Sequence, residues 1–438
     1  MKNREEAIRI FLSGVESVKP DNLINRFVSL RDNILSFNNI EFDIRFIENI
    51  YIIGAGKASA RMAQAIESIL GSRITAGHIV TKYQHSVPLK YISITEACHP
   101  VPDENGVEGT RKILSLLSKT KIDDLVICLL SGGGSALLAD VPEGCTLDDV
   151  KSVNNILLKS GATISEMNCI RKHLSAVKGG LLAKAAAPAS LVSLILSDVI
   201  GDPLDVIASG PTATDPSTFR DAHAILRKYE IEDHIPLKIK QFLKFGSEGK
   251  YPETLKKGDE IVDYTYNLVI GNNRLALTSA KEKAEFFGYE ARIVTDRLEG
   301  DVENVSAEIF NLAILMKQQN PHQNSCLLFG GEPTVKVRGQ GLGGRNQHLA
   351  LLMAKLLKDH PGITFLSCGT DGTDGPTDAT GAVSDSFTSP NALEHNLNID
   401  YYIENHDSNH FFKQVGGLII TGPTQTNVMD LMVVLIRK

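Results

Sequence analysis

Short apolar runs alternate with helical segments through the first 200 residues, and this alternation constrains the fold more than any other feature. The runs are rich in Val, Ile and Leu, and they lie at 50–53, 77–80, 91–95, 125–130 and 191–196. Segments with helical periodicity lie between them at 58–70, 105–118 and 147–158. Strands that alternate with helices form βαβ units, so we expect an α/β fold with a largely parallel sheet covered on both faces.

A second alternation follows a polar stretch at 228–257 that is broken by prolines and glycines. We interpret this stretch as a surface connection between two domains, which agrees with a length of 438 residues. Further apolar runs lie at 266–270, 291–294, 325–329, 364–367, 417–421 and 431–436. Residues 422–430 are too few for a helical crossover between the last two runs, so we expect this second sheet to be antiparallel or mixed.

Composition and charge exclude several classes of protein. A net charge of −7 argues against a nucleic-acid surface, which needs clustered Lys and Arg. The longest apolar region, 180–200, contains Lys184, Pro188 and Asp198, so we expect no membrane span. The six cysteines show no CxxC pair, and we expect reduced thiols in a cytoplasmic protein. The N-terminal residues have the pattern of an amphipathic helix and lack the continuous apolar core of a signal peptide.

The first candidate site is Gly54-Ala55-Gly56-Lys57-Ala58-Ser59, which follows an apolar strand and opens a helix. Ligands of open parallel sheets bind beyond the carboxyl ends of the strands. A dinucleotide fingerprint is one alternative, but the next strand ends in Thr81-Lys82 and lacks the acid that would hold a ribose. We therefore interpret Lys57 as a ligand for an oxyanion; the plainer alternative is an exposed lysine at a helix start.

A second glycine-rich segment, Ser131-Gly132-Gly133-Gly134-Ser135, follows the strand at 125–130. Glycines flanked by hydroxyls make a backbone nest for a phosphate or carboxylate, here expected at a helix N-terminus. The GK[ST] ending of a Walker loop is missing.

Two carboxylates, Asp198 and Asp202, lie just past the apolar strand at 191–196. Either residue is suited to hold Mg²⁺ together with a substrate phosphate, or to accept a hydroxyl proton. The alternative is ordinary turn and cap chemistry. The turn at 209–212 lies near enough in sequence to reach the same ligand.

The second half of the chain carries Gly330-Gly331-Glu332-Pro333-Thr334 and then Gly341-Leu342-Gly343-Gly344-Arg345-Asn346-Gln347. Glycines allow the backbone to approach a ligand closely, and arginine grips a carboxylate or phosphate through two parallel hydrogen bonds. The pair of segments predicts an anion site around Arg345; the alternative is two tight turns.

Two further segments are candidates. Asp371, Asp374 and Asp378 lie on a glycine-rich turn past the strand at 364–367, which suits a metal-assisted site but not an EF-hand, since the ligand spacing and closing glutamate are missing. A solvated loop is the alternative. The segment 168–180 places Arg171, Ser175 and Lys178 on one face of a predicted helix, as a basic binding face or a solvated one.

Taken together, these motifs resemble the glycerate 2-kinase family, whose C-terminal part is called the MOFRL domain. The resemblance covers nearly the whole chain and rests on these segments: GAGKAS (54–59), HPVPDENG (99–106), LLSGGGSALL (129–138), RKHLSAVKGG (171–180), LSDVIGDPLDVIASGPT (196–212), GGEPTV (330–335), GGRNQ (343–347), GTDGTDGPTDATGA (369–382) and TGPTQTNVMDL (421–431). The family pattern near the C-terminus reads closer to TGPTGTNVNDL, so Gln425 and Met429 depart from it, and we assign no ligand role to position 429.

The resemblance implies a two-domain enzyme with its active site in the interdomain cleft. We expect a Rossmann-like α/β/α domain with a mostly parallel sheet over 1–250 and a MOFRL-type α/β domain with a mixed sheet over 251–438. Such enzymes transfer phosphate from ATP to D-glycerate with Mg²⁺, which gives 2-phosphoglycerate.

The resemblance also assigns roles to residues. Lys57 and Arg345 correspond to the residues thought central to catalysis, and we expect them to share one ligand, with Asp198 orienting the substrate hydroxyl. Candidate metal ligands are Asp198 and Asp374. Candidate substrate- and nucleotide-binding residues are Gly54, Gly56, Ser59, Ser131, Gly132, Gly133, Gly134, Ser135, Arg171, Lys178, Gly331, Glu332, Asn346 and Asp371. The expected partners are small molecules, and the expected state is a monomer or homodimer.

Two rival functions stay open at this stage. One is an NAD-dependent hydroxypyruvate reductase, against which the missing ribose acid and Lys57 weigh. The other is a non-catalytic sugar-phosphate sensor, because glycine-rich loops can bind a ligand without turnover.

Overall fold

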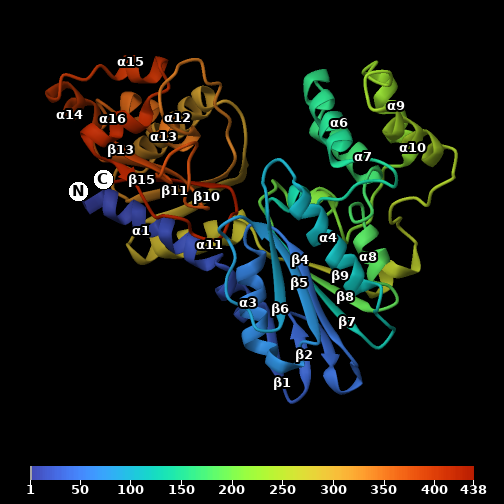
Figure 1. Ribbon diagram of the computed structural model, residues 1–438. Helices are drawn as coiled ribbons and strands as arrows, with labels where there is room; N and C mark the ends of the chain where they lie inside the picture. The colour runs from blue at the N-terminus through green and yellow to red at the C-terminus, as the bar shows by residue number, and fades with distance from the viewer. Residues whose placement is uncertain (1) are drawn as a thin grey trace. The chain divides into compact units, whose positions relative to one another are not determined.

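The computed structural model describes residues 2–438 and divides them into two compact units (Figure 1). The first unit is Leu23–Ile270, and the second combines the residues up to Asn22 with Gly271–Lys438. Each unit contains its own six-stranded sheet with helices on both faces. The α/β fold with two domains is therefore confirmed.

The sheet of the unit Leu23–Ile270 is parallel over its first five strands. Its order is β6 (Ile92–Ala97), β5 (Ala76–Lys82), β4 (Ile50–Ala55), β7 (Leu125–Leu130), β8 (Ser190–Leu196) and β9 (Thr265–Gly271). Helices connect β4 to β5, β6 to β7 and β7 to β8, whereas a loop without a helix, 83–91, connects β5 to β6. Every residue of β4 and β7 is buried, which explains their unbroken apolar sequence.

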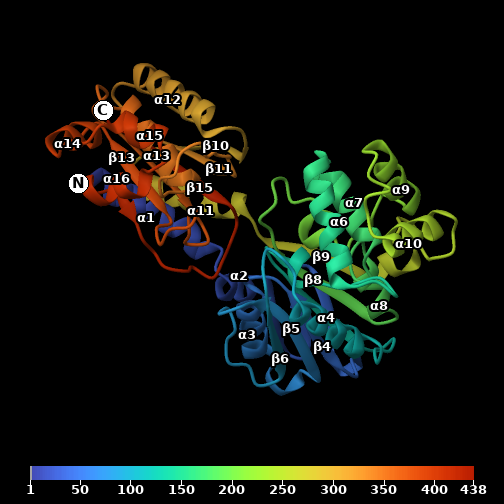
Figure 2. The same ribbon diagram turned by 45° about the horizontal axis from the view of Figure 1, so that its top comes forward.

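Helices cover both faces of this sheet (Figure 2). The helix α3 (Ser59–Leu70) packs against β4, β5 and β7, while α4 (Glu104–Leu117) and α8 (Leu181–Ala186) cover the other face. Ile113 and Leu117 of α4 join Leu182 of α8 in one apolar core with alternate residues of the strands. A small antiparallel sheet of β1 (Val28–Arg31), β2 (Ile34–Phe37) and β3 (Ile40–Asp43) belongs to the same unit.

Four more helices form a separate apolar cluster within this unit. They are α6 (Leu147–Ser160), α7 (Ile164–His173), α9 (Phe219–Lys228) and α10 (Leu237–Ser247). Their apolar faces bury one another, with Val153, Ile170, Leu226 and Leu243 among the buried residues. This cluster carries one wall of the cavity described below.

The sheet of the second unit is mixed, as expected. Its order is β10 (Glu290–Leu298), β11 (Ser325–Gly331), β15 (Asp430–Ile436), β12 (Ile363–Gly369), β13 (Gly381–Asp385) and β14 (Leu418–Ile419). Strand β11 is parallel to β10, while the C-terminal strand β15 inserts antiparallel between β11 and β12.

The helices α1 (Lys2–Ser17) and α11 (Asn273–Phe286) pack on each other and on one face of this second sheet. The other face is covered by α12 (Val302–Gln319) and α13 (Arg345–Leu356), whose buried residues share a core with Phe329, Phe365 and Met432. The remaining α-helices are α2 (Pro20–Phe27), α5 (Gly134–Leu137), α14 (Thr388–Glu394), α15 (Ile399–Glu404) and α16 (Ser408–Val415).

The division of the chain differs from the expected boundary at 250/251 in two ways. The run at 266–270 is the edge strand β9 of the first sheet, and the polar stretch at 228–257 contains α10 and the buried residues Thr254 and Leu255, so it is not a surface connection. The helix α1 packs with the second unit, because its apolar residues, such as Ile10 and Phe11, are buried there. Amphipathic periodicity predicted this helix but could not show which core would bury it.

Candidate functional site

The sheet of the unit Leu23–Ile270 changes its winding direction between β4 and β7. From β4 the chain continues to β5 and β6 on one side, and it then returns to β7 and β8 on the other. Ligands of open α/β sheets bind at this kind of switch point, beyond the carboxyl ends of the strands. Here the loop that carries Lys57 follows β4, and the Ser131–Gly133 loop follows β7. The structure thus brings together the first two segments predicted to bind an anion.

Hydrogen bonds join these two loops. The amide of Lys57 donates to the carbonyl of Gly132 at 2.9 Å, and the amide of Ala58 donates to Ser131 Oγ at 3.0 Å. The hydroxyl of Ser59 is buried and donates to the carbonyl of Leu129 at 3.2 Å. The predicted binding residues Ser59 and Ser131 therefore fix the two loops to each other. Gly54 lies against Leu129 of β7, and Gly56 lies against Ser131 in the loop that follows.

Each glycine of Gly132-Gly133-Gly134 makes room for a different neighbour. A Cβ at Gly132 would overlap the carboxylate of Asp198, and one at Gly134 would lie 2.7 Å from Ala208 Cβ. At Gly133, which has φ 84°, a Cβ would lie 2.9 Å from the ring of His99 and 3.4 Å from Lys57 Cγ. The triple glycine therefore gathers Asp198, His99 and Lys57 around one loop.

The expected helix N-terminus after this loop contributes little. Helix α5 is a single turn of four residues, Gly134–Leu137. Such a short helix has almost no macrodipole, so the expectation of a helix-dipole site at Ser131–Ser135 is not met. An anion bound here would therefore contact side-chain charges and the left-handed turn at Gly133.

The surroundings of Lys57 include a second lysine, Lys82, and the ring of His99. Burial lowers the pKa of His99 to about 4, and the charges of Lys57 and Lys82 add to this effect. His99 is therefore neutral at pH 7 and can accept or donate a hydrogen bond without adding charge. A half-buried lysine in such surroundings suits a phosphate or carboxylate.

Backbone strain lies against the same loop. Ala208 and Ser209 have φ values of 50° and 63°, in the left-handed region that disfavours residues with a Cβ. The Ser209 hydroxyl is hydrogen-bonded to that of Ser135 at 2.9 Å. Strain of this kind persists where the surroundings enforce it, often at ligand sites. Asp202 also has a positive φ of 54°, which agrees with the turn alternative for that residue.

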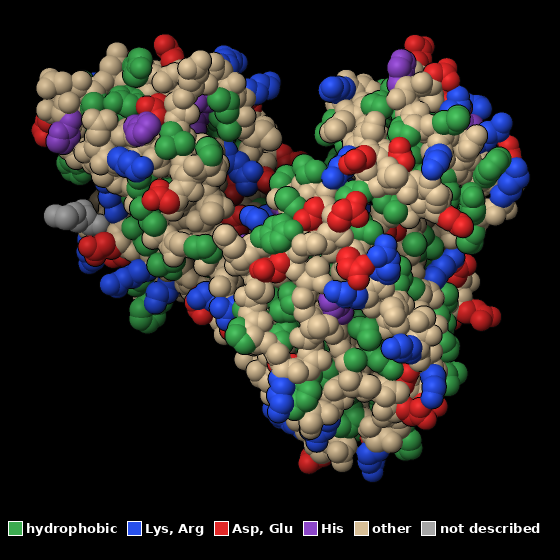
Figure 3. Space-filling view, in the orientation of Figure 1, with side chains coloured by type: hydrophobic (Ala, Val, Ile, Leu, Met, Phe, Trp, Pro, Cys, Tyr) green, Lys and Arg blue, Asp and Glu red, His purple; other side chains and the backbone are tan. Residues whose placement is uncertain are grey.

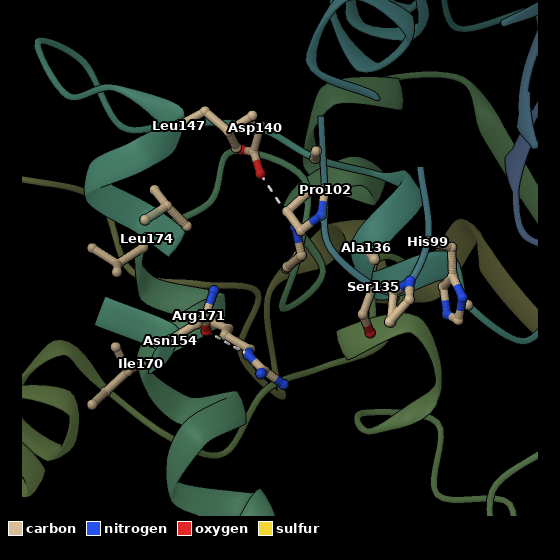
Figure 4. A pocket seen from close by; sticks show the side chains of 15 residues that line it. His99, Pro102, Ser135, Ala136, Asp140, Leu147, Asn154, Ile170, Arg171 and Leu174 are labelled. Atoms are coloured by element: carbon tan, nitrogen blue, oxygen red, sulfur yellow. Dashed lines mark hydrogen bonds and ion pairs between the residues drawn. The ribbon is translucent and has the colours of Figure 1, made fainter. Parts of the chain in front are cut away.

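A cavity of about 300 Å³ adjoins this loop (Figure 4). Arg171 reaches into it from α7, and its Nε donates to Asn154 Oδ1 at 2.8 Å. Burial lowers the pKa of Arg171, and no carboxylate of the described chain is paired with it. The Lys178 ammonium lines the same cavity but donates to the carbonyl of Leu138 at 2.7 Å and to Asp140 at 3.3 Å. Arg171 is thus available to bind an anionic ligand, whereas the hydrogen bonds of Lys178 stabilise the wall of the cavity.

The predicted helical face with Arg171, Ser175 and Lys178 is wrong. Helix α7 ends at His173, and the other two residues lie in the turn that follows. The Ser175 hydroxyl donates to Asp140 at 2.7 Å and accepts from the amide of Lys178 at 3.0 Å, so it ends the helix and builds the turn.

In the second unit, the register of the sheet places Asp430 between two glycine strand ends. Asp430 opens β15 and lies opposite both Gly331 of β11 and Gly369 of β12. Its side chain is buried. Burial raises the pKa of Asp430 to about 6, although its hydrogen bonds with Arg345 act in the opposite direction.

Arg345 is bound by carboxylates within its own unit. Its Nε and Nη2 donate to Asp430 at 2.6 and 3.0 Å, and its Nη1 donates to Glu332 at 2.7 Å. Burial disfavours the charged guanidinium, but these contacts raise the pKa of Arg345 overall. Three of the five N–H donors are used in this way, which leaves two for a ligand. We predicted that Arg345 binds a substrate through two parallel hydrogen bonds. In the structure Asp430 accepts such a pair of hydrogen bonds instead.

The carboxylate of Asp374, from another segment, binds the N-terminus of helix α13, in which Asn346 is the second residue. The Asp374 carboxylate accepts from the amides of Asn346 and Gln347 at 3.0 and 2.8 Å, and from the side chain of Gln347 at 2.9 Å. Burial raises the pKa of Asp374, while these hydrogen bonds oppose the shift. Its oxygens are occupied by the helix N-terminus, so the donor set does not fit the predicted metal role. The Asn346 side chain is buried and accepts from Ser367 at 2.6 Å, which makes it part of the support.

Asp371 lies in the adjacent turn, where its carboxylate accepts from Thr373 at 3.0 Å.

Sequence reasoning missed three residues of these sites: His99, Asn154 and Asp430. His99 and Asp430 lie within segments that carried the family resemblance, and their apolar or turn-like surroundings gave no sign of a role. No group of three or more His, Cys, Asp or Glu side chains suited to a metal ion occurs among residues 2–438.

On the face shown in Figure 3, Lys and Arg side chains are interspersed with Asp and Glu. Among residues 2–438 no helix is both long and apolar enough to cross a membrane. The six cysteines are all free thiols.

Comparisons with known proteins cover the whole chain. Residues 6–244 match a family described as "Domain of unknown function (DUF4147)", and residues 325–430 match the MOFRL family. Glycerate 2-kinase of Pyrococcus horikoshii is 38% identical over 100% of this chain and 98% of its own, and D-glycerate 2-kinase of Thermotoga maritima is 39% identical over 98% and 97%. A putative hydroxypyruvate reductase of Agrobacterium vitis is 40% identical over 88% and 86%.

A crystal structure of glycerate kinase from Thermotoga maritima covers 100% of both chains, with a TM-score of 0.89 and 39% identity. The chain therefore belongs to the glycerate 2-kinase family.

Proposed function

We propose that this protein is a kinase that transfers the γ-phosphate of ATP to D-glycerate and forms 2-phosphoglycerate and ADP. One observation carries the proposal: Lys57 lies where two glycine-rich loops meet at the switch point of a parallel sheet, close to the ring of His99. Full-length similarity to proteins named glycerate 2-kinase supplies the substrate class.

Phosphoryl transfer depends mainly on positioning and on stabilisation of charge, with little covalent chemistry for the protein. In this proposal Lys57 binds the phosphoryl group in transfer and stabilises the charge that develops on it. Neutral His99, against Gly133, orients the same group through a hydrogen bond. Asp198, whose carboxylate lies against Gly132, orients the acceptor hydroxyl or receives its proton.

Magnesium fits the Asp198 region of this site better than the Asp374 region. Mg²⁺ is usually held by one or two carboxylates together with substrate phosphates and water. Asp198 beside the Gly132 loop offers one such carboxylate next to the proposed phosphate position. The ion would supply charge neutralisation on the phosphates when bound. We accordingly propose Asp198, and not Asp374, as the protein ligand of Mg²⁺.

We also propose that the second unit takes part in the reaction through Arg345. Two of its N–H donors remain after its contacts with Asp430 and Glu332, enough for one carboxylate or phosphate. Asp430 holds the plane of the guanidinium, so that these donors keep a fixed direction.

An assay of the purified protein with ATP, Mg²⁺ and D-glycerate tests the proposal. We expect ADP release that requires D-glycerate, and an NMR spectrum of the product that places phosphorus on the oxygen of carbon 2. Phosphorus on carbon 3 would overturn the regiochemistry alone. Binding of glycerate without any ADP release would favour the sensor. Loss of activity on chelation, restored by Mg²⁺, would support the metal requirement.

The alternative function, reduction of hydroxypyruvate with NADH, is favoured only by the name of one relative. Strand β5 ends in Lys82, where a dinucleotide site would carry an acid for the ribose. NADH oxidation in the presence of hydroxypyruvate, without ATP, would replace the kinase proposal. We further propose that the enzyme is cytoplasmic. We also propose that it is a monomer or a homodimer, and light scattering can decide between these two oligomeric states.

A further inference from the structure

The cavity beside Gly133 has two kinds of wall. One wall is apolar and consists of Leu147 and Val150 of α6, Ile170 of α7, and Leu174 directly after α7. The other consists of the loops that carry His99 and Ser135. At about 300 Å³ the cavity lies at the lower end of the range for sites that enclose drug-sized ligands, and a three-carbon acid would leave most of it empty. An apolar wall is also a poor match for glycerate, which carries a polar group on every carbon.

The polar groups of the cavity suit a planar heterocycle. Asn154 uses its Oδ1 to accept from Arg171 Nε, so its Nδ2 is left as a donor, and this atom has no acceptor among residues 2–438. Ring nitrogens of a purine are acceptors that such an amide can bind. Hydrogen bonds to Asn154 and Asn168 fix the orientation of the Arg171 guanidinium. It has no carboxylate partner within the described chain. A planar guanidinium binds a phosphate or stacks on a ring.

The cavity is continuous with the Lys57 loop. Gly133 and His99 line it, and a Cβ at this glycine would lie 3.4 Å from Lys57 Cγ. A ligand with its ring between α6 and α7 would therefore direct a chain of phosphates past Gly133 toward Lys57. Figure 4 shows Ser135 and His99 on the side of the cavity opposite Leu147, Ile170 and Leu174.

We propose that this cavity binds the nucleoside part of the phosphoryl donor, with the base against Ile170 and Leu174 and the phosphates leading past Gly133 to Lys57. The acceptor acid then binds outside the cavity. This inference rests on the proposed function for the identity of the donor, and it assigns the nucleotide, not glycerate, to the space between α6 and α7.

The test uses a variant whose new side chain fills the cavity and that leaves the loops of Lys57 and Gly133 unchanged. Val150 is half-buried and lines the cavity, so Val150→Phe places a ring in the nucleoside space. The matched control is Leu158→Phe on the same helix, at a side chain that is 63% exposed. Calorimetry with the full chain measures binding of ADP and of inorganic tripolyphosphate. We expect Val150→Phe to weaken ADP binding at least tenfold and to leave tripolyphosphate unchanged, whereas Lys57→Met weakens both.

The steady-state assay gives the second readout. We expect Val150→Phe to raise the KM for ATP at least tenfold and to change the KM for D-glycerate less than twofold. Ala136→Leu narrows the cavity from the opposite wall and should act in the same direction, which guards against a folding defect in one variant. A rise in the KM for glycerate with unchanged ADP binding would overturn the inference and make the cavity the acceptor site. Unchanged ADP binding in both variants would overturn it as well.

These measurements separate the inference from the proposed function. ADP binding that responds to Val150→Phe supports the nucleoside site even if glycerate is not phosphorylated. Conversely, kinase activity with ADP binding unaffected by either variant would leave the proposed function intact and remove the cavity from it.

Discussion

The two cationic loops of this protein have similar sequences and opposite electrostatic environments. Lys57 and Arg345 both follow a buried strand that ends in glycines, and both lie at or beside a helix start. Lys57 lies near a second lysine, Lys82, and a neutral histidine, His99, whereas Arg345 is bound by Asp430 and Glu332. A glycine-rich turn with a cation therefore predicts an anion site, but the tertiary partners decide whether the cation is open to a ligand or already neutralised.

Removal of the Lys57 ammonium should give the largest effect on activity with the smallest effect on folding. We expect Lys57→Met to lower kcat/KM roughly 10³-fold, on the order of 4 kcal/mol, because no other cation replaces it at the loop junction. The free energy of unfolding should change by less than about 0.5 kcal/mol. Urea denaturation measures the second quantity.

Lys57→Arg should also fail, with a loss of roughly 10²-fold, because Lys57 Cγ packs beside Gly133 and the position suits a point charge better than a planar fork. Near wild-type turnover by either variant would show that the reaction takes place elsewhere.

Arg345→Lys should reduce both activity and stability, in contrast to the Lys57 variants. The lysine keeps the charge but cannot make the paired hydrogen bonds to Asp430, so we expect kcat/KM to fall roughly 10²-fold, on the order of 3 kcal/mol. The buried Asp430 loses part of its support, which should cost about 1–3 kcal/mol of the free energy of unfolding.

Arg274→Lys is the matched control, because Arg274 forms only an exposed pair with Asp296 in the same unit. We expect that change to stay below about 0.5 kcal/mol. If Arg345→Lys lost stability but kept full activity, Arg345 would be a structural residue alone.

The pH dependence should report on Asp430. Burial raises its pKa to about 6, so the carboxylate gains a proton as the pH falls through 6 and its hold on Arg345 weakens. We expect kcat/KM at pH 5 to be about tenfold below its value at pH 7, and Asp430→Asn to remove this acid limb while lowering activity throughout. Asp374→Asn should leave the limb in place, because Asp374 contacts the helix N-terminus and not Arg345.

The same shift has a consequence for stability. Between the unfolded pKa near 4 and the folded value of about 6, the folded protein binds more protons than the unfolded chain. The contribution of Asp430 to the free energy of unfolding therefore decreases as the pH rises through this window. In Asp430→Asn this component should be absent, and a denaturation series from pH 4 to pH 7 measures the difference.

The smallest effect concerns the C-terminal loop, where Gln425 and Met429 depart from the family pattern. Both residues have positive φ values, 63° and 70°, in the region that favours Gly and Asn. The family pattern at these positions thus reflects backbone conformation. Gln425 is exposed, so Gln425→Gly should raise the free energy of unfolding by about 0.5 kcal/mol and leave kcat unchanged. A fall in kcat would instead indicate that the Gln425 side chain contacts a reactant.

The sequence by itself determined the strands, most helices and the class of chemistry. Unbroken apolar runs such as those of β4 and β7 favour buried strands, and the alternation of such runs with helices favours a parallel sheet. The same patterns could not distinguish a helical turn from the cap structure at Ser175–Lys178, because the spacing of side chains is the same until the helix ends.

Only the tertiary structure decided which partner each functional side chain has. It showed that Asp374 is used by the start of α13, that Asp430 holds Arg345, and that α1 and β9 belong to units other than those expected. The physical reason is that local periodicity and turn chemistry depend on neighbours a few residues apart. Ion pairs, buried pKa shifts and domain membership depend on contacts between residues far apart in the chain, such as the 85 positions between Arg345 and Asp430.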